Sequence, residues 1–378
     1  MDPYAGWRAF ASIVARTTFL AALLAGAQPA GAADGWSKGL LRRGVDPEQV
    51  PNPIAITPEI KAAADEFAGG VGGTIDELRR IQSALFDAKR FTFDYEASLT
   101  ETAAEALAAR RGNCVSFTNL FIAMGRARGL VVKAGYITPR VTGVRRGDLV
   151  YVTTHVVAVF ALHDRSVVFD FYRTREEATA RIRLLDDFEL AALFLNNRAV
   201  DALSAGDYAL AESRLNDVLK LAPSFAAAHG NLGVLKRRGG DTAGAFDAYR
   251  RALAIDPRDP SVLGNLAALY RSLGRDREAR AALALADLSR ATPYTVLARG
   301  DLEAADGRVE AALRYYRRAA RLDPKIPDPQ VSIARLARSN GRLEDARRAA
   351  ARALKIDPTN AEASKILAEL NAAERPVP

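Results

Sequence analysis

Three residue types that can together perform nucleophilic catalysis occur in the first half of the sequence. Cys114 is the only cysteine of the 378-residue chain, and it directly follows Gly112 and Asn113. His155 interrupts the apolar run VTTHVVAVF, where an unpartnered imidazole would carry a desolvation cost. Asp170 lies among apolar and aromatic neighbours in VVFDFY. A thiol, an imidazole and a carboxylate can serve as nucleophile, general base and orienting group.

The segment after Cys114 predicts a helix that begins at the thiol. Its apolar residues recur at helical spacing and predict one buried stripe formed by Phe117, Leu120, Phe121 and Met124. The backbone N–H groups and the positive end of the dipole at a helix N-terminus favour a thiolate. The same N–H groups can receive the oxyanion that attack on a carbonyl creates. We therefore expect a reactive thiol here, although a lone cysteine can also be a small buried hydrophobic residue.

Apolar and β-branched segments predict the strands that carry the other two residues. Residues 130–137, 149–160 and 166–172 read as strands, and the last two are joined by a tight turn at His163 and Asp164. This segment order predicts an α+β domain in which the histidine and the aspartate lie on neighbouring strands.

The register of this hairpin decides whether the two side chains can meet. A two-residue turn places Asp170 opposite Val157, and Val157 lies on the same face as His155, so the carboxylate and the imidazole are diagonal neighbours. A slip of one residue would send them to opposite faces. Asp170 could instead pair with a nearby arginine such as Arg173, and His155 could be satisfied by backbone groups.

These elements resemble the transglutaminase-like superfamily. The segments GNC at a helix start, ARGLVVKAGYI, TTHVVAVF and VVFDFY follow its order over roughly residues 91–172. The resemblance implies a papain-like core in which Cys114 is the nucleophile, His155 the general base and Asp170 the residue that orients the imidazole. It also implies a peptidase or amidase type of activity on the amide bonds of proteins or peptides.

The chain departs from the pattern of this superfamily at three valines. Val115 replaces the tryptophan that often follows the cysteine, and Val157 and Val159 replace a tryptophan and an acidic residue after the histidine. Because these positions help to form the substrate and acyl-acceptor sites, hydrolysis and acyl transfer both stay open, and no second oxyanion donor is identified. A non-catalytic scaffold with a degenerate transglutaminase-like binding module is the alternative.

No metal or cofactor is expected. One cysteine and three scattered histidines give no ligand cluster of the usual spacing. Of the two histidines outside the predicted triad, His163 falls in the hairpin turn and His229 in a later helix.

The second half of the chain repeats itself with a period of 34 residues. Glycines, prolines and alanines keep one phase through it: Gly206, Gly240, Gly274, Gly307 and Gly341; Pro223, Pro257, Pro324 and Pro358; Ala211, Ala245, Ala279, Ala312 and Ala346. A helix-turn-helix unit of this length with these landmarks is the tetratricopeptide pattern. We expect an all-α solenoid of five repeats and a capping helix over residues 189–374.

Such a solenoid binds proteins or peptides on its concave face more often than it catalyses. Arg237, Arg271 and Arg338 occupy one position in three repeats and form a spaced row that could receive an acidic segment. The alternative is that these arginines are ordinary helix-forming residues on a solvated face.

Composition and the first residues bound the remaining possibilities. The chain is 49% hydrophobic and 26% charged, with a net charge of +8 and a pI of about 9.6. Its arginines are scattered without aromatic interleaving, so nucleic acid is not expected as a partner.

Residues 1–32 have the layout of a secretory signal, with Arg8 and Arg16 before an apolar run and small residues. We expect a periplasmic or secreted protein, or alternatively an N-terminally anchored one, with an extension over residues 33–54 and the transglutaminase-like domain over residues 55–188.

Overall fold

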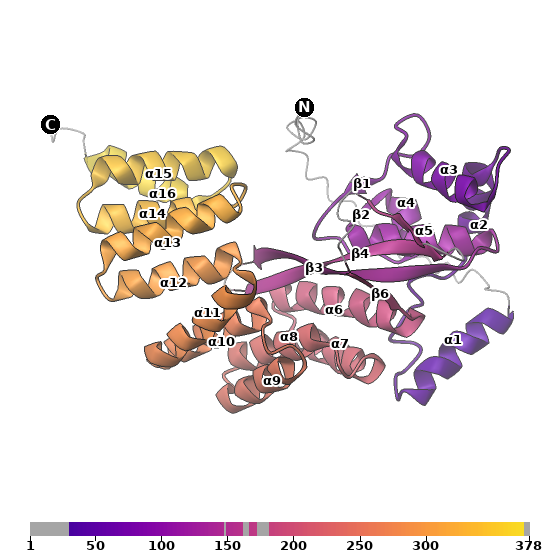
Figure 1. Ribbon diagram of the computed structural model, residues 1–378, viewed down its shortest axis with the longest axis horizontal. Helices are drawn as coiled ribbons and strands as arrows, with labels where there is room; N and C mark the ends of the chain where they lie inside the picture. The colour runs from indigo at the N-terminus through magenta and orange to yellow at the C-terminus, as the bar shows by residue number, and fades with distance from the viewer. Residues whose placement is uncertain (1–29, 147–148, 162–165, 172–180, 374–378) are drawn as a thin grey trace.

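The structure is a computed structural model that describes four segments of the chain: residues 30–146, 149–161, 166–171 and 181–373. The described residues form an α/β region followed by a helical solenoid (Figure 1), as the sequence predicts. Most of the predicted signal and the turn at His163 and Asp164 lie outside the described residues. No described helix is long and apolar enough to span a bilayer.

The α/β region begins with helices and two very short strands. These elements are α1 (Ala30–Arg42), α2 (Pro58–Ala68), α3 (Thr74–Phe86), β1 (Asp94–Tyr95), α4 (Ala103–Ala109), β2 (Arg111–Gly112) and α5 (Cys114–Ala127). The helix predicted after Cys114 is therefore present and begins at the thiol. It is buried on all sides over residues 115–125, not along one stripe. The reason is that α2, α3 and α4 pack against it in addition to strands of the sheet.

A four-stranded antiparallel sheet packs against α5. Its strands are β3 (Val132–Arg146), β4 (Leu149–Ala161), β5 (Ser166–Phe169) and β6 (Arg181–Leu185), in the order β5-β4-β3-β6. The pairs Ala161 with Ser166 and Ala158 with Phe169 confirm the predicted register of the β4–β5 hairpin. The strand β5 ends one residue before Asp170, whereas the sequence predicted a strand through residue 172. Strand β6 was not predicted.

The solenoid consists of five helix pairs and a last helix that covers the end. The pairs are α6 (Asp187–Ala205) with α7 (Tyr208–Leu221), α8 (Ala226–Arg238) with α9 (Thr242–Ile255), α10 (Pro260–Ser272) with α11 (Asp276–Arg290), α12 (Pro293–Ala305) with α13 (Val309–Leu322) and α14 (Asp328–Ser339) with α15 (Leu343–Ile356), followed by α16 (Ala361–Ala373). The five loop glycines all have a positive φ, between 68° and 84°, which a residue with a side chain rarely adopts. The five phased alanines are fully buried where the two helices of a pair meet.

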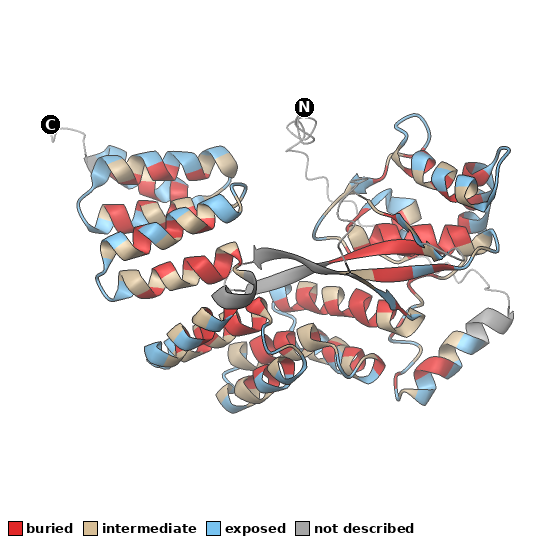
Figure 2. Ribbon diagram, viewed as in Figure 1, coloured by how far each residue is buried: buried red, intermediate tan, exposed pale blue. Residues whose placement is uncertain are grey.

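The two regions share one hydrophobic core. A continuous cluster of buried residues runs from Leu40 to Leu269 and therefore includes the first helices of the solenoid (Figure 2). The long β3–β4 hairpin extends along the solenoid as far as α12, and its strands contact α6, α10 and α12 (Figure 1). Arg126 of α5 forms a two-pronged ion pair with Asp187 of α6, with N–O distances of 2.7 and 2.8 Å. The regions are thus packed together as the short connection between them suggests.

Candidate active site

Cys114 is the first residue of α5, and the residue before it caps the helix. The Asn113 side-chain oxygen accepts hydrogen bonds from the amides of Val115 at 3.0 Å and Ser116 at 3.2 Å. These two first-turn amides are therefore engaged, which corrects the expectation that they stand open to an oxyanion. Cys114 as a residue is half-buried, in contrast to the fully buried residues that follow it in α5.

The turn before Cys114 is held against the loop of residues 99–101. The Asn113 amide donates to the Leu99 carbonyl at 2.8 Å, and the Ser116 hydroxyl donates to the same carbonyl at 3.0 Å. Gly112 has a φ of +155°, and a Cβ there would lie 2.4 Å from the Ser116 Cβ. Only glycine fits this close approach, so Gly112 fixes how the chain enters the helix that carries the thiol.

His155 lies on β4, opposite an irregularity in β3. His155 pairs with Ile137, and the register then shifts before Thr142 pairs with Thr153. Such bulges bend a strand and re-aim the side chains beside it. The Thr118 hydroxyl on α5 donates to the Val156 carbonyl at 3.2 Å, which fixes the nucleophile helix against the strand that carries the imidazole.

Asp170 meets His155 as the register predicts. The His155 Nε2 and the Asp170 Oδ2 lie 2.7 Å apart, and the two side chains are only 8% and 14% exposed. Gln82 of α3 donates its side-chain amide to the Asp170 carbonyl oxygen at 2.9 Å. Gln82 was missed by the sequence analysis, because nothing local marks a contact between residues 88 positions apart.

Aromatic packing holds the short segment around Asp170 although it lies beyond the end of β5. The ring of Phe169 stacks on that of Phe121 with centroids 4.8 Å apart. Phe171 contacts three further rings of the core, at centroid distances of 5.3 to 6.1 Å: Phe86, Phe93 and Phe117. Both neighbours of Asp170 are therefore anchored, which limits the directions that its carboxylate can take.

Cys114, the third residue of the predicted triad, interacts with the imidazole of His155. Burial lowers the pKa of His155, but hydrogen bonds to Asp170 and Cys114 and the negative charges of both groups outweigh this effect and raise it to about 9. The imidazole is thus a cation at neutral pH, held between a carboxylate and a sulfur. A neighbouring imidazolium is one of the surroundings that favour a thiolate.

The three valines that depart from the family pattern are all packed in the interior. Val115, Val157 and Val159 are 1%, 0% and 2% exposed. In this chain none of them forms part of an open wall beside the thiol. His229 lies on α8, where its Nε2 is 3.1 Å from the Pro223 carbonyl, and it takes no part in the site.

A charged cluster connects the loop beside the thiol with the solenoid. Arg198 of α6 pairs with Glu101 and Glu105 at 2.9 Å each. Burial and the neighbouring Glu105 raise the pKa of Glu101 to about 7 in spite of Arg198. The Glu101 amide also donates to the Ser116 hydroxyl at 2.8 Å, so one residue contacts both the first turn of α5 and the first repeat.

The predicted arginine row is partly occupied by contacts within the chain. Arg271 lies 3.8 Å from Asp301, and Arg338 pairs with Glu369. Both acids belong to the first helix of the next repeat or to the capping helix. Arg237, the third member, lies in the last turn of α8. Among the described residues, no group of three or more His, Cys, Asp and Glu side chains is placed to hold a metal ion.

Comparisons with known proteins divide the chain in two. The model of the transglutaminase-like superfamily matches residues 61–169. Two tetratricopeptide-repeat models match residues 183–260 and residues 236–295 and 303–370. A comparison with curated protein sequences finds no match.

Solved structures similar to this chain are tetratricopeptide-repeat proteins and cover about half of it. PilF of Pseudomonas aeruginosa is 22% identical over 50% of this chain and 86% of its own, with a TM-score of 0.43. PilW, a type IV pilus biogenesis factor, is 22% identical over 48% and 91% of the two chains, with a TM-score of 0.41. A repeat protein of Thermus thermophilus is 22% identical over 48% and 99%, with a TM-score of 0.43.

Proposed function

Because the chain carries a transglutaminase-like domain followed by tetratricopeptide repeats, we propose that it is a cysteine hydrolase or acyltransferase that acts on amide bonds of protein or peptide substrates. The repeats serve in recognition of a protein or peptide. The observation that carries the proposal is the 2.7 Å contact between His155 and Asp170, with Cys114 close enough to the same imidazole to contribute to its raised pKa.

The geometry supports a two-step reaction. The Cys114 thiolate attacks the amide carbon, a C–S bond forms, and the carbonyl electrons move to the oxygen. The His155 imidazolium gives its proton to the leaving nitrogen, so that the C–N bond breaks and a thioester remains. Water or an amine then attacks the thioester, and the neutral imidazole takes up its proton. The C–S bond breaks and the thiolate leaves, which restores the pair of thiolate and imidazolium. Asp170 stabilises the imidazolium throughout and fixes its ring.

The three buried valines favour one alternative, a recognition scaffold in which the cysteine no longer reacts. They replace residues that, in the family pattern, form the substrate and acceptor sites, and none of them is exposed here. The half-buried cysteine beside a charged imidazole opposes this alternative, because a scaffold has no use for such an arrangement.

Reactivity of the thiol separates the two functions. In the full chain we expect iodoacetamide to label Cys114 rapidly near pH 6, where an ordinary thiol is almost entirely protonated and unreactive. His155→Ala should slow the labelling, whereas the matched control His229→Ala should leave it unchanged. Slow labelling of the wild type, rising only above about pH 8 as for a free thiol, would leave the scaffold.

The reaction itself is tested with an electrophilic amide-like probe in extracts of the host. We expect it to trap the wild-type chain but not Cys114→Ala.

The location that we propose, outside the cytoplasm, is tested by sequencing the N-terminus of the mature protein, which should begin after Ala27 or Ala32.

A further inference from the structure

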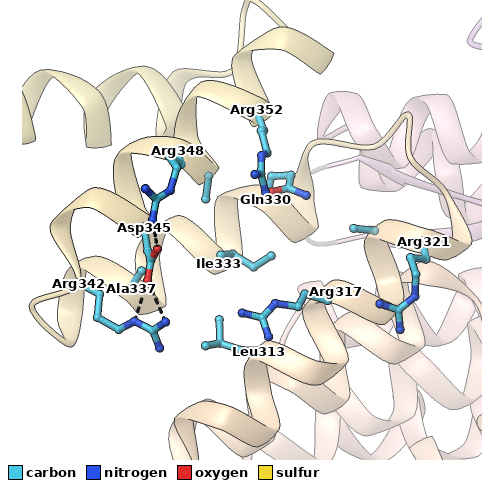
Figure 3. Close-up of a pocket in the computed structure, with 12 residues that line it drawn as sticks. Leu313, Arg317, Arg321, Gln330, Ile333, Ala337, Arg342, Asp345, Arg348 and Arg352 are labelled. Atoms are coloured by element: carbon cyan, nitrogen blue, oxygen red, sulfur yellow. Dashed lines mark hydrogen bonds and ion pairs between the residues drawn. The ribbon is translucent and has the colours of Figure 1, made fainter.

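A pocket of about 360 Å³ lies among α13, α14 and α15, far along the chain from the thiol (Figure 3). Its walls come from the second helices of the last two repeats, and α14 lies between them. The charged residues that line it are five arginines and one aspartate: Arg317, Arg321, Arg342, Arg348, Arg352 and Asp345. The pocket therefore carries a concentrated positive charge.

Two of the five arginines have acidic partners in the part of the chain that the structure describes, and three do not. Arg342 and Arg348 both pair with Asp345, at 2.8 and 2.5 Å. The remaining three form no ion pair with any residue that the structure describes: Arg317, Arg321 and Arg352. In Figure 3 the Arg317 guanidinium points toward the middle of the pocket, whereas Asp345 lies between Arg342 and Arg348. An anionic ligand would supply the missing counter-charge.

The pocket also has an apolar part and a polar atom without a partner. Leu313, Ile333, Ala337 and Ala349 contribute hydrocarbon surface. The Gln330 Oε1 is buried and has no hydrogen-bond partner among the described residues. A buried acceptor without a donor is costly, so a ligand that brings an N–H group would be stabilised here.

We propose that this pocket binds an acidic peptide segment of a partner protein, with acidic and apolar side chains next to each other. The carboxylates pair with Arg317, Arg321 and Arg352, an apolar side chain packs on Leu313 and Ile333, and a peptide N–H donates to Gln330. Inorganic phosphate brings charge but neither an N–H donor nor an apolar side chain. An acidic peptide with apolar side chains uses all three features of the pocket.

The contacts of the first helices favour this second-helix pocket over the concave face. The β3 and β4 strands contact α10 and α12, the first helices of repeats three and four. In addition, Arg271 and Arg338 of the predicted row already have acidic neighbours within the chain. The inference rests on the recognition role proposed for the repeats, but it is independent of the chemistry proposed for Cys114.

The test measures binding of a fluorescein-labelled peptide of alternating glutamate and leucine to the full chain by fluorescence anisotropy. One variant combines Arg317→Gln, Arg321→Gln and Arg352→Gln, and the control combines Arg277→Gln, Arg314→Gln and Lys355→Gln, which removes the same charge at exposed positions outside the pocket. We expect Kd to rise about tenfold or more in the pocket variant and by less than about threefold in the control. Gln330→Leu should weaken binding by about threefold to tenfold.

Several results would overturn the inference. Equal weakening in the two triple variants, or equal binding of a lysine–leucine peptide, would indicate that no specific acidic site exists. Competition by inorganic phosphate as strong as that by unlabelled peptide would indicate a simple anion site. Loss of binding on Arg271→Gln with retention in the pocket variant would place recognition on the concave face. Cys114→Ser should bind the peptide like the wild type, so failure of the proposed chemistry and failure of this inference give different results.

Discussion

The transglutaminase-like domain and the repeat array obtain their structures from contacts of very different range. His155 and Asp170 are separated by 15 residues, and the Gln82 contact that holds Asp170 joins residues 88 apart. In the array, by contrast, each helix pair closes through a loop glycine and a buried alanine five residues later. The candidate site thus depends on single contacts that nothing duplicates, whereas the array spreads its stability over repeated ones.

The largest effect that this comparison predicts comes from the charge on Asp170. Asp170→Asn keeps the shape of the side chain but removes the charge that holds the imidazolium, so the pKa of His155 should fall. We expect the rate of iodoacetamide labelling of Cys114 at neutral pH to drop on the order of 100-fold. Glu96→Gln, which removes a surface partner of Arg111, is the control and should leave the rate unchanged. An unaltered rate in Asp170→Asn would show that the carboxylate has no role.

Gly112→Ala tests the turn that places the thiol. The added Cβ would collide with the buried Ser116 side chain, so the first turn of α5 must shift. We expect a loss of about 3 kcal/mol in the free energy of unfolding and a strong fall in labelling of Cys114. Gly129→Ala adds a Cβ at a positive φ in open space and should cost only about 1 kcal/mol, with the labelling rate retained. Equal effects of the two substitutions would contradict the role of the close approach.

The raised pKa of His155 makes the stability of the α/β region depend on pH. Because the pKa is about 9 in the folded chain and near 6.5 in an unfolded one, the folded state binds the proton more tightly. The resulting stabilisation is fully present below pH 6.5 and is lost as the pH rises through about 9, and it should amount to about 3 kcal/mol. Urea unfolding across this pH range measures the free energy of unfolding of the wild type and of His155→Gln. The difference between these two free energies should shrink with rising pH. The difference between the wild type and His229→Gln should stay constant.

The smallest changes in stability are expected within the array. Alanine substitutions of two helix glycines there should change the stability in opposite directions. A Cβ on Gly233 of α8 would lie 2.5 Å from the rigid, buried ring of Tyr249, so Gly233→Ala should destabilise the chain by about 1 to 3 kcal/mol. A Cβ on Gly264 of α10 meets only the Thr295 methyl group at an ordinary 3.6 Å. Gly264→Ala should therefore stabilise the helix, by up to about 1 kcal/mol. Thermal unfolding followed by circular dichroism measures both changes, and the same sign in both would contradict this description of the packing.

The repeats could be predicted closely because their signals are local. A loop glycine implies a left-handed backbone and a phased alanine implies close helix packing, and both are confirmed at all five positions. The meeting of His155 with Asp170 was also predicted, since a hairpin register follows from a short turn. The predicted outer bounds of the α/β domain, residues 55–188, stay a prediction.

Other features depend on contacts between residues that are far apart in the sequence, and no local pattern marks such contacts. The burial of residues 115–125 of α5 on all sides results from helices on its far side, and the role of Gln82 results from the way α3 packs. The pairing of the arginine row did leave a signal that the sequence analysis missed. Asp301 follows Arg271 by 30 residues and Glu369 follows Arg338 by 31, a little less than one repeat in each case.

The continuous cluster of buried side chains from Leu40 to Leu269 has a consequence for how this protein can change over evolution. The cluster includes residues of the helices α6 to α10, so these helices have to be inherited with the α/β half as a single piece. The helices from α13 onward pack into smaller clusters that share no residue with this one, so they can be exchanged, added or deleted without exposing that piece to solvent. New specificities can therefore arise at the free end of the chain while the candidate active site in its other half stays untouched.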